Sequence, residues 1–173
     1  MPAFALLAVG ADRPGIIAAV AERLVAHGVN ITDSQMGILR GSFAMALALS
    51  VPDAADPAAL EADLRDVSER LRLEAMVLRP VMAGPARAEA THAVNVYGAD
   101  HPGIVAAVTG ALARHGVNIC DLRTRLAGGL YVMHLEVARP EHLGDERLRE
   151  AMAAVGGLQD VQITVTPIDA ELL

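Results

Sequence analysis

Apolar positions recur along the first half of this chain with two different periods, and each period predicts one kind of element. Residues 3–9 form an apolar run that ends at a turn of sequence GADRPG, which is typical of a buried strand entering a tight loop. From Gly15 to about His27, apolar residues recur every four positions, with Pro14 at or near the first helical position and Gly28 just past the end. This pattern predicts a helix with both ends marked.

Two strand-like runs follow, at residues 30–39 and 42–51, and the intervening Arg40-Gly41 predicts a hairpin. The second run alternates large apolar residues with alanines, which indicates that both of its faces are buried, one of them against a closely approaching partner. Asp56-Pro57 then opens an amphipathic segment with i,i+4 charge pairs outside its apolar stripe, which predicts a helix. An apolar run over residues 74–82 closes this half as a strand.

The second half repeats the first. The stretch GADRPGIIAAVAERLVAHGVNITD returns as GADHPGIVAAVTGALARHGVNICD, at an offset of about 88 residues. The repeat predicts the same elements in the same order, with a shorter second helix that stops before Gly156-Gly157. The predicted elements are a strand at 91–97, a helix up to Gly116, a hairpin around Gly128-Gly129, a helix around 145–155 and a strand over 158–168.

Each half therefore follows the order strand, helix, strand, strand, helix, strand. This order predicts an α+β, ferredoxin-like βαββαβ domain, in which a four-stranded antiparallel sheet carries two helices on one face. We expect two such domains, at 1–82 and 91–173, joined by a linker at 83–90 that is small, proline-bearing and unpatterned. The other sheet face is left for water or a partner, and the alanine-rich strand favours a partner, either the other domain or another chain.

Composition narrows the class of protein. The chain has 173 residues, of which 53% are apolar, yet no run approaches the ~20 uninterrupted apolar residues of a membrane helix. The amino terminus lacks the features of a secretory signal, so we expect a cytoplasmic protein. A net charge of −7 argues against direct binding to nucleic acid. The single cysteine, Cys120, excludes an internal disulfide, and we expect it to be a small buried filler.

The loop and helix start in each half carry groups that suit a free amino acid. Backbone N–H groups at a helix N-terminus favour a carboxylate, and the loop glycine lets a ligand approach the backbone. The loop aspartate can accept hydrogen bonds from an ammonium group, and the asparagine directly after the helix can donate and accept at the mouth of the same site. These residues are Asp12, Gly15 and Asn30 in the first half and Asp100, Gly103 and Asn118 in the second.

Each of these residues also has a purely structural interpretation. The aspartates can cap the helix, Gly28 and Gly116 can end it, and the asparagines can hydrogen-bond at its exit. We favour ligand binding because the matched residues concentrate at the two places that flank the helix. His27 and His115 have no second ligand at metal spacing, so no metal is expected. No nucleophile, phosphate or dinucleotide motif is present, so no cofactor and no catalysis are expected.

The pattern Asp-x-Pro-Gly, helix, Gly-Val-Asn-Ile in both halves resembles that of ACT domains, small regulatory modules that bind amino acids in many metabolic enzymes and some regulators. Two such domains alone are similar to the family of the glycine cleavage system transcriptional repressor. The resemblance implies that units associate through their sheets and bind effectors at the junction between units. Carried over, it points to Asp12, Arg13, Pro14, Gly15, Asn30 and Ile31, and to Asp100, His101, Pro102, Gly103, Asn118 and Ile119.

The resemblance has two departures. Serine-binding members place a histidine two residues before the aspartate, where this chain has Gly10 and Gly98, so that side-chain contact is missing. Arg13 in the first loop stands against His101 in the second, which implies that the two sites need not be equivalent.

Together these features predict a non-catalytic regulator that senses a small amino acid and signals through protein contacts. The expected partners are a second copy in a homodimer and a transcription regulator or metabolic enzyme. Repression of glycine cleavage genes is the most specific form, and the acidic chain would act there through a partner. The alternative is a structural pairing or regulatory subunit of an amino-acid metabolic enzyme, with no ligand of its own; an enzyme with unrecognised chemistry ranks last.

Overall fold

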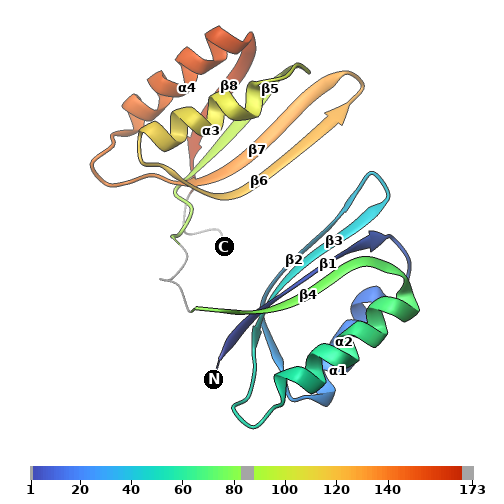
Figure 1. The fold of residues 1–173 in the computed structure, drawn as a ribbon. Helices are drawn as coiled ribbons and strands as arrows, with labels where there is room; N and C mark the ends of the chain where they lie inside the picture. Colours follow the sequence, from blue (N-terminus) through green and yellow to red (C-terminus); the bar gives the residue numbers. More distant parts are fainter. Residues whose placement is uncertain (1, 83–87, 169–173) are drawn as a thin grey trace. The chain divides into compact units, whose positions relative to one another are not determined.

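A computed structural model describes residues 2–82 and 88–168 of the chain. The chain divides into two compact units, Met1–Gly84 and Pro85–Leu173 (Figure 1). The expected linker at 83–90 spans the division between the units, and its residues 83–87 lie outside the described part.

The two units have the same order of elements. Unit 1 contains β1 (Ala3–Ala11), α1 (Ile16–Ala26), β2 (Asn30–Leu39), β3 (Ser42–Ser50), α2 (Pro57–Leu71) and β4 (Leu73–Val81). Unit 2 contains β5 (His92–Ala99), α3 (Ile104–Arg114), β6 (Asn118–Ala127), β7 (Leu130–Ala138), α4 (Asp145–Gln159) and β8 (Val161–Pro167). The antiparallel sheets run in the orders β2-β3-β1-β4 and β6-β7-β5-β8, and each carries both helices of its unit on one face (Figure 1). The predicted ferredoxin-like fold is confirmed in both units.

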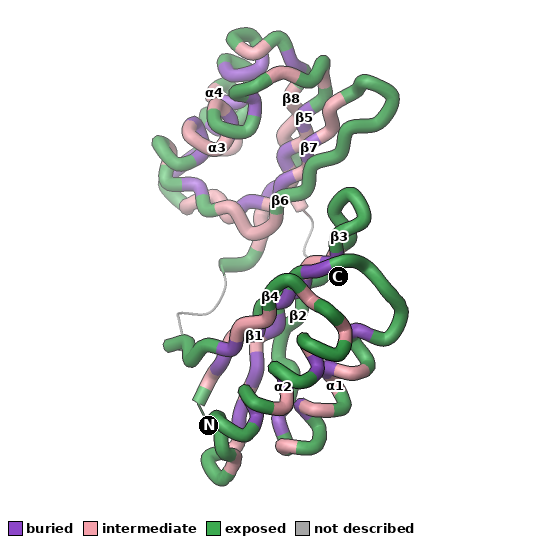
Figure 2. Tube along the Cα trace, turned by 45° about the vertical axis from the view of Figure 1, so that its right-hand side comes forward, coloured by how far each residue is buried: buried purple, intermediate pink, exposed green. Residues whose placement is uncertain are grey.

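Each unit has its own hydrophobic core between the sheet and the helices. The period of two in β3 turns Phe43 and Leu49 inward, and the stripe of α1 adds Val20 and Leu24. Unit 2 is built alike, with Leu135 of β7 facing the corresponding stripe of α3. The hairpin tips of both units are exposed throughout (Figure 2). The buried side chains therefore stabilise the packing of the helices on the centre of each sheet, and the tips of the long hairpins project beyond the core.

The outer face of the unit 1 sheet is not buried by unit 1 itself. Ala46 of β3 is exposed, and Leu7 on the neighbouring strand is 52% exposed. Unit 1 therefore does not cover this face itself, because both helices lie on the other face, and the burial of the second face of β3 by a partner stays a prediction. Unit 2 is more polar here, since Asn95 Oδ1 lies 2.7 Å from Nδ1 of His134 on the paired strand.

The first helix of each unit ends as predicted but begins later. Gly28 has a φ of +67°, and the N–H groups of Gly28 and Val29 donate to the carbonyls of Val25 and Leu24, which is a Schellman ending. At the other end the N-cap is Gly15, whose φ of +93° is left-handed. The helix cannot start at Pro14, because this turn intervenes.

Two further predictions in unit 2 are wrong. The helix α4 runs through Gly156-Gly157 to Gln159, because Gly156 packs tightly against β8 rather than ending the helix; a Cβ there would lie 2.8 Å from the carbonyl oxygen of Val161. Cys120 is half-exposed rather than buried, and it occupies the register shift between Ile119 and Asp121 of β6. Its thiol donates to the Ala88 carbonyl at 3.2 Å.

Candidate functional site

The loops after β1 and β5, here loop 1 (residues 12–15) and loop 2 (residues 100–103), each end in the glycine that caps the following helix. Gly15 and Gly103 have φ values of +93° and +105°, a conformation that side chains disfavour. No heavy atom lies within 4 Å of a Cβ placed on Gly15, whereas Oε1 of Gln159 lies 3.6 Å from one on Gly103. The first N–H groups of a helix have no intrahelical acceptor, so each loop opens onto donors that favour an anion.

The loop aspartates do not cap these helices. The N-cap residues are glycines, and neither helix start has a side-chain cap. Asp12 and Asp100 are exposed, and the backbone N–H of Asp12 donates to the Gly41 carbonyl at 3.2 Å, which ties loop 1 to the tip of the β2–β3 hairpin. Their capping interpretation is therefore wrong. Arg13, Pro14 and Pro102 are exposed beside them.

The structure does not bring the asparagine of a unit together with the loop of the same unit. Asn30 opens β2 and pairs with Ser50, which in turn pairs with Ala3 at the start of β1. Loop 1 follows the opposite end of β1, a strand of nine residues whose ends are about 26 Å apart at ~3.3 Å per residue. A single site that uses both groups therefore needs two units. Asn118 has the same place at the start of β6.

Ile31 and Ile119 follow these asparagines on β2 and β6, which are edge strands of their sheets. Beside β2 lies a hollow of about 130 Å³ between α1 and the sheet, lined by apolar side chains that include Ile17, Ile31 and Met36. Ile17 is 47% exposed and Met36 49%. Neither residue is among the site residues predicted from the sequence. The available signal was Ile17, an apolar residue outside the buried stripe of α1.

The glycines two positions before the loop aspartates lie against the neighbouring edge strand. A Cβ on Gly10 would lie 2.9 Å from Leu73 Cδ2 and 3.0 Å from its Cα, and one on Gly98 would lie 2.5 Å from Val161 Cγ1. The packing therefore leaves no room for a histidine at either position unless β4 or β8 moves.

Loop 2 has contacts that make it unlike loop 1. Nε2 of His101 lies 2.8 Å from the Gln159 carbonyl oxygen, and Nδ1 lies 3.1 Å from that of Pro102. These two backbone hydrogen bonds raise the pKa of His101 above its ordinary value. Burial raises the pKa of Tyr131, and the carboxylate of Asp100 adds to this effect.

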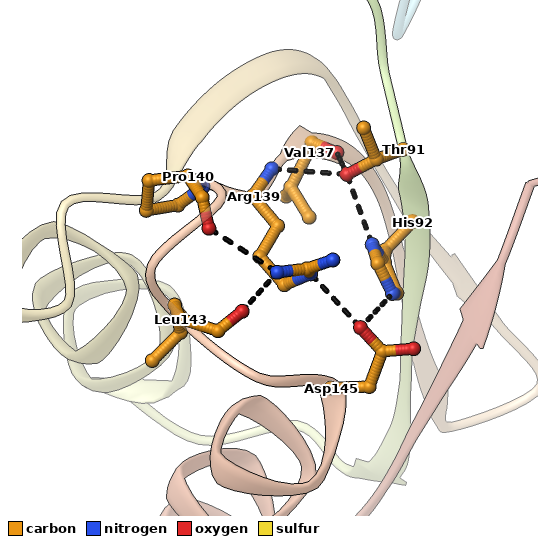
Figure 3. Close-up of polar contacts among 7 residues, drawn as sticks. All are labelled: Thr91, His92, Val137, Arg139, Pro140, Leu143 and Asp145. Carbon is orange, nitrogen blue, oxygen red and sulfur yellow. Dashed lines mark hydrogen bonds and ion pairs between the residues drawn. The ribbon is translucent and has the colours of Figure 1, made fainter.

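A second polar group in unit 2 surrounds His92 at the start of β5 (Figure 3). Loop 2 follows the other end of this strand. The buried ring of His92 has its Nε2 3.3 Å from Asp145 Oδ1 and its Nδ1 2.9 Å from Thr91 Oγ1. Arg139 Nε lies 2.9 Å from the same oxygen of Asp145, and its guanidinium also donates to the carbonyl of Leu143. These contacts join the start of β5, the end of β7 and the start of α4. We therefore interpret this polar group as structural, holding these three elements of unit 2 together.

Neither a metal nor a membrane site emerges from the described residues. Across 2–82 and 88–168, histidine, cysteine and carboxylate side chains form no group of three that could hold a metal ion. Within the same ranges, no helix is long and apolar enough to cross a membrane.

The sequence of each unit matches the model of one known protein family. The sequence model of the ACT domain matches residues 4–77 and again residues 92–166, and both matches contain the candidate loop and asparagine. The chain belongs to the ACT domain family. Its ACT units thus cover most of the chain.

Relatives of these ACT units occur in proteins of different length. Phosphoserine phosphatase SerB2 of Mycobacterium tuberculosis is 31% identical over 116 residues, which is 66% of this chain but only 28% of the relative. A UPF0237 protein of Methanopyrus kandleri is 34% identical over 70 residues, 40% of this chain and 78% of that protein. The chain thus spans little more than a quarter of the phosphatase.

Two solved structures follow this chain over nearly its whole length. A protein described as unknown, from Galdieria sulphuraria, has a TM-score of 0.78 at 28% identity and covers 96% of this chain and 98% of its own. A candidate glycine cleavage system transcriptional repressor has a TM-score of 0.76 at 20% identity, with 96% and 97% covered. At that identity the second likeness concerns the fold alone.

Proposed function

We propose that this chain is a non-catalytic regulator that binds a small free amino acid at the junction of two ACT units and signals through protein contacts. The observation that carries the proposal is the loop that opens each first helix. It combines an exposed aspartate that caps nothing with a glycine that leaves the helix N-terminus open. The capping role that competed with ligand binding does not apply to these aspartates.

The two ends of an amino acid match two parts of this loop. The carboxylate of the ligand accepts hydrogen bonds from the N–H groups behind Gly15 or Gly103, where the helix dipole favours negative charge. The ammonium group of the ligand donates to Asp12 or Asp100, and a hydrogen bond between charged groups is stronger than one between neutral groups. A ligand with both charges close together therefore fits better than a simple anion.

The asparagine that completes the site comes from a second ACT unit. Because Asn30 and loop 1 lie at opposite ends of β1, an antiparallel arrangement of two units can set the loop of one against the asparagine of the other. Within their own sheets β2 and β6 are edge strands, so one side of each strand does not pair with another strand of that sheet. A second unit can approach along that side. A second copy of the chain, the homodimer expected from the sequence, can supply that unit. Ligand and association are then linked, since the site is complete only when units are paired.

Control of glycine cleavage genes is the finer form of this proposal. The likeness to a candidate repressor of that system supports it at the level of fold. The net charge of −7 opposes direct contact with DNA phosphates, so the chain acts through a protein partner.

Calorimetric titration of the full chain with glycine, serine and the other free amino acids tests the proposal. We expect saturable heat with one small amino acid or a few, because the site has to fit both charged ends. Absence of heat across the whole set would contradict ligand sensing.

A second function, ligand-free pairing with an amino-acid metabolic enzyme, is favoured by the apolar outer face of the unit 1 sheet. Leu7 is 52% exposed there, and Val9 36%. Isolated apolar residues on a surface are ordinary, but a continuous patch marks an interaction site. If the chain associates with such an enzyme, and no free amino acid changes the affinity of that association, ligand-free pairing is favoured over sensing.

A further inference from the structure

One contact distinguishes the two loops: it joins loop 2 to the C-terminal end of α4. His101 occupies the place that Arg13 has in loop 1. Its imidazole reaches the carbonyl of Gln159, 58 positions along the chain, at 2.8 Å, and the carbonyl of Pro102 at 3.1 Å. Gln159 is the last residue of α4, and Pro102 directly precedes the N-cap of α3. The ring therefore bridges the start of one helix and the end of the other.

Both acceptors of this ring are carbonyl oxygens, so both ring nitrogens have to donate. A neutral imidazole has one N–H and one lone pair, and only the protonated ring donates from both nitrogens. The hydrogen bond to Gln159 has the largest part in raising the pKa of His101, followed by that to Pro102, and desolvation lowers it by less. The geometry and the direction of the pKa agree.

The charged groups around the ring act in the same direction. Asp100, in the same loop, and Asp160, the C-cap of α4, both raise the pKa of His101. Tyr131, from β7, has its pKa raised from about 10 and so stays neutral around pH 7. The protonated ring is thus favoured from the loop and from α4, and Tyr131 does not oppose it.

We propose that His101 is a proton-dependent clasp that holds loop 2 against α4, so that the candidate effector site of unit 2, and not that of unit 1, responds to pH. Below the ordinary pKa of histidine, about 6.5, the protonated ring makes both contacts in full. As the pH rises through the raised pKa of His101, the ring loses one N–H and keeps only one of the two hydrogen bonds. Loop 2 then loses either the bond to Gln159, which attaches it to α4, or the bond to Pro102, which lies within the loop. Loop order is therefore greatest on the acid side and falls as the pH rises.

Unit 1 lacks the titrating group for such a clasp. The residue at the place of His101 is Arg13, and it has no imidazole. At the end of α2 the C-cap is Arg72, which takes the place that Asp160 has in unit 2 and has the same left-handed φ, 52° against 51°. A cation thus replaces an anion at the end of this helix. The consequence for ligand binding rests on the function proposed above, whereas the clasp itself does not.

A pH titration of the ligand-free full chain by NMR, from about pH 5.5 to about pH 8.5, tests the clasp. We expect the His101 ring to titrate above 6.5 and the amide signals of loop 2 to shift with the same midpoint, while those of loop 1 do not follow it. His101→Gln should abolish the shift of loop 2. His115→Gln, which removes a histidine at the other end of α3, should leave it unchanged.

Two results would overturn the clasp: a His101 midpoint at or below 6.5, or a loop 2 shift that persists in His101→Gln. Calorimetry with the amino acid panel separates the clasp from the proposed function. If loop 2 titrates as expected but no amino acid binds, the clasp stands and the sensing function fails. If an amino acid binds but loop 2 does not follow His101, the sensing function stands and the clasp fails.

Discussion

Replacing Gly156 with alanine lowers the free energy of unfolding of unit 2 by about 1–3 kcal/mol. The glycine lies where α4 crosses β8, and an added Cβ would be 2.8 Å from the Val161 carbonyl oxygen and 3.6 Å from Ile163 Cγ1. A backbone oxygen cannot rotate away as a side chain can, so the helix has to move off the strand. Urea unfolding of the full chain, followed through amide signals of unit 2, measures the loss.

The neighbouring glycine provides the matched control. Gly157 is exposed, lies in the same helix and has no heavy atom within 4 Å of an added Cβ. Gly157→Ala should therefore raise the free energy of unfolding by up to about 1 kcal/mol, through helix propensity alone. Equal effects of the two substitutions would mean that α4 and β8 are not packed as described.

The double substitution Asn30→Ala with Asn118→Ala should weaken amino acid binding by about 10- to 100-fold. This corresponds to loss of a hydrogen bond to a charged ligand group, about 1.5–3 kcal/mol. Both asparagines are exposed and begin edge strands, so the free energy of unfolding should change by less than about 0.5 kcal/mol. Calorimetry and urea unfolding of the same samples measure both quantities.

Asn95→Ala is the control for this pair. Asn95 lies on the outer face of the unit 2 sheet and contacts His134, away from the candidate loops. Its loss should leave the affinity unchanged. If the double substitution instead lowers stability and leaves the affinity unchanged, Asn30 and Asn118 serve only the exits of their helices.

The fold could be predicted from the sequence because its signals are local. The hairpin turn Arg40-Gly41 needs positive φ at both residues, and the structure has 52° and 88° there. Gly28 ends its helix for the same reason, because this position also has a positive φ, +67°. Gly156-Gly157 has the same local signal, but the close approach of β8 gives Gly156 a packing role instead. That contact depends on tertiary structure, so local propensity placed the C-terminus of α4 too early, before Gly156.

The place of Asn30 illustrates a different kind of error. Sequence reasoning set it at the mouth of the site formed by loop 1, although the helix between them separates its own two ends. A helix of eleven residues is about 16 Å long at 1.5 Å per residue. The length of the predicted helix already indicated that one unit cannot use both groups, and the sheet register then fixed them at opposite ends of β1.

The contact between His101 and Gln159 lies beyond sequence reasoning, because it joins groups 58 positions apart. The sequence indicated only that Arg13 and His101 differ. The polar group around His92 was missed for the same reason: its members are far apart along the chain, and the corresponding positions of unit 1 include the apolar Phe4 and Val51. Repeat comparison at these positions is the signal that could have found it.

The most direct test of amino acid sensing is a paired calorimetric titration of the native chain and of the double variant Asp12→Asn, Asp100→Asn. The amide has nearly the same shape as the carboxylate and lacks its charge, and neither aspartate caps a helix, so folding should be unaffected. We predict saturable binding of a small amino acid by the native chain and an affinity at least about tenfold lower in the variant. Equal affinity of the two proteins, or no binding by the native chain, would contradict the proposed site.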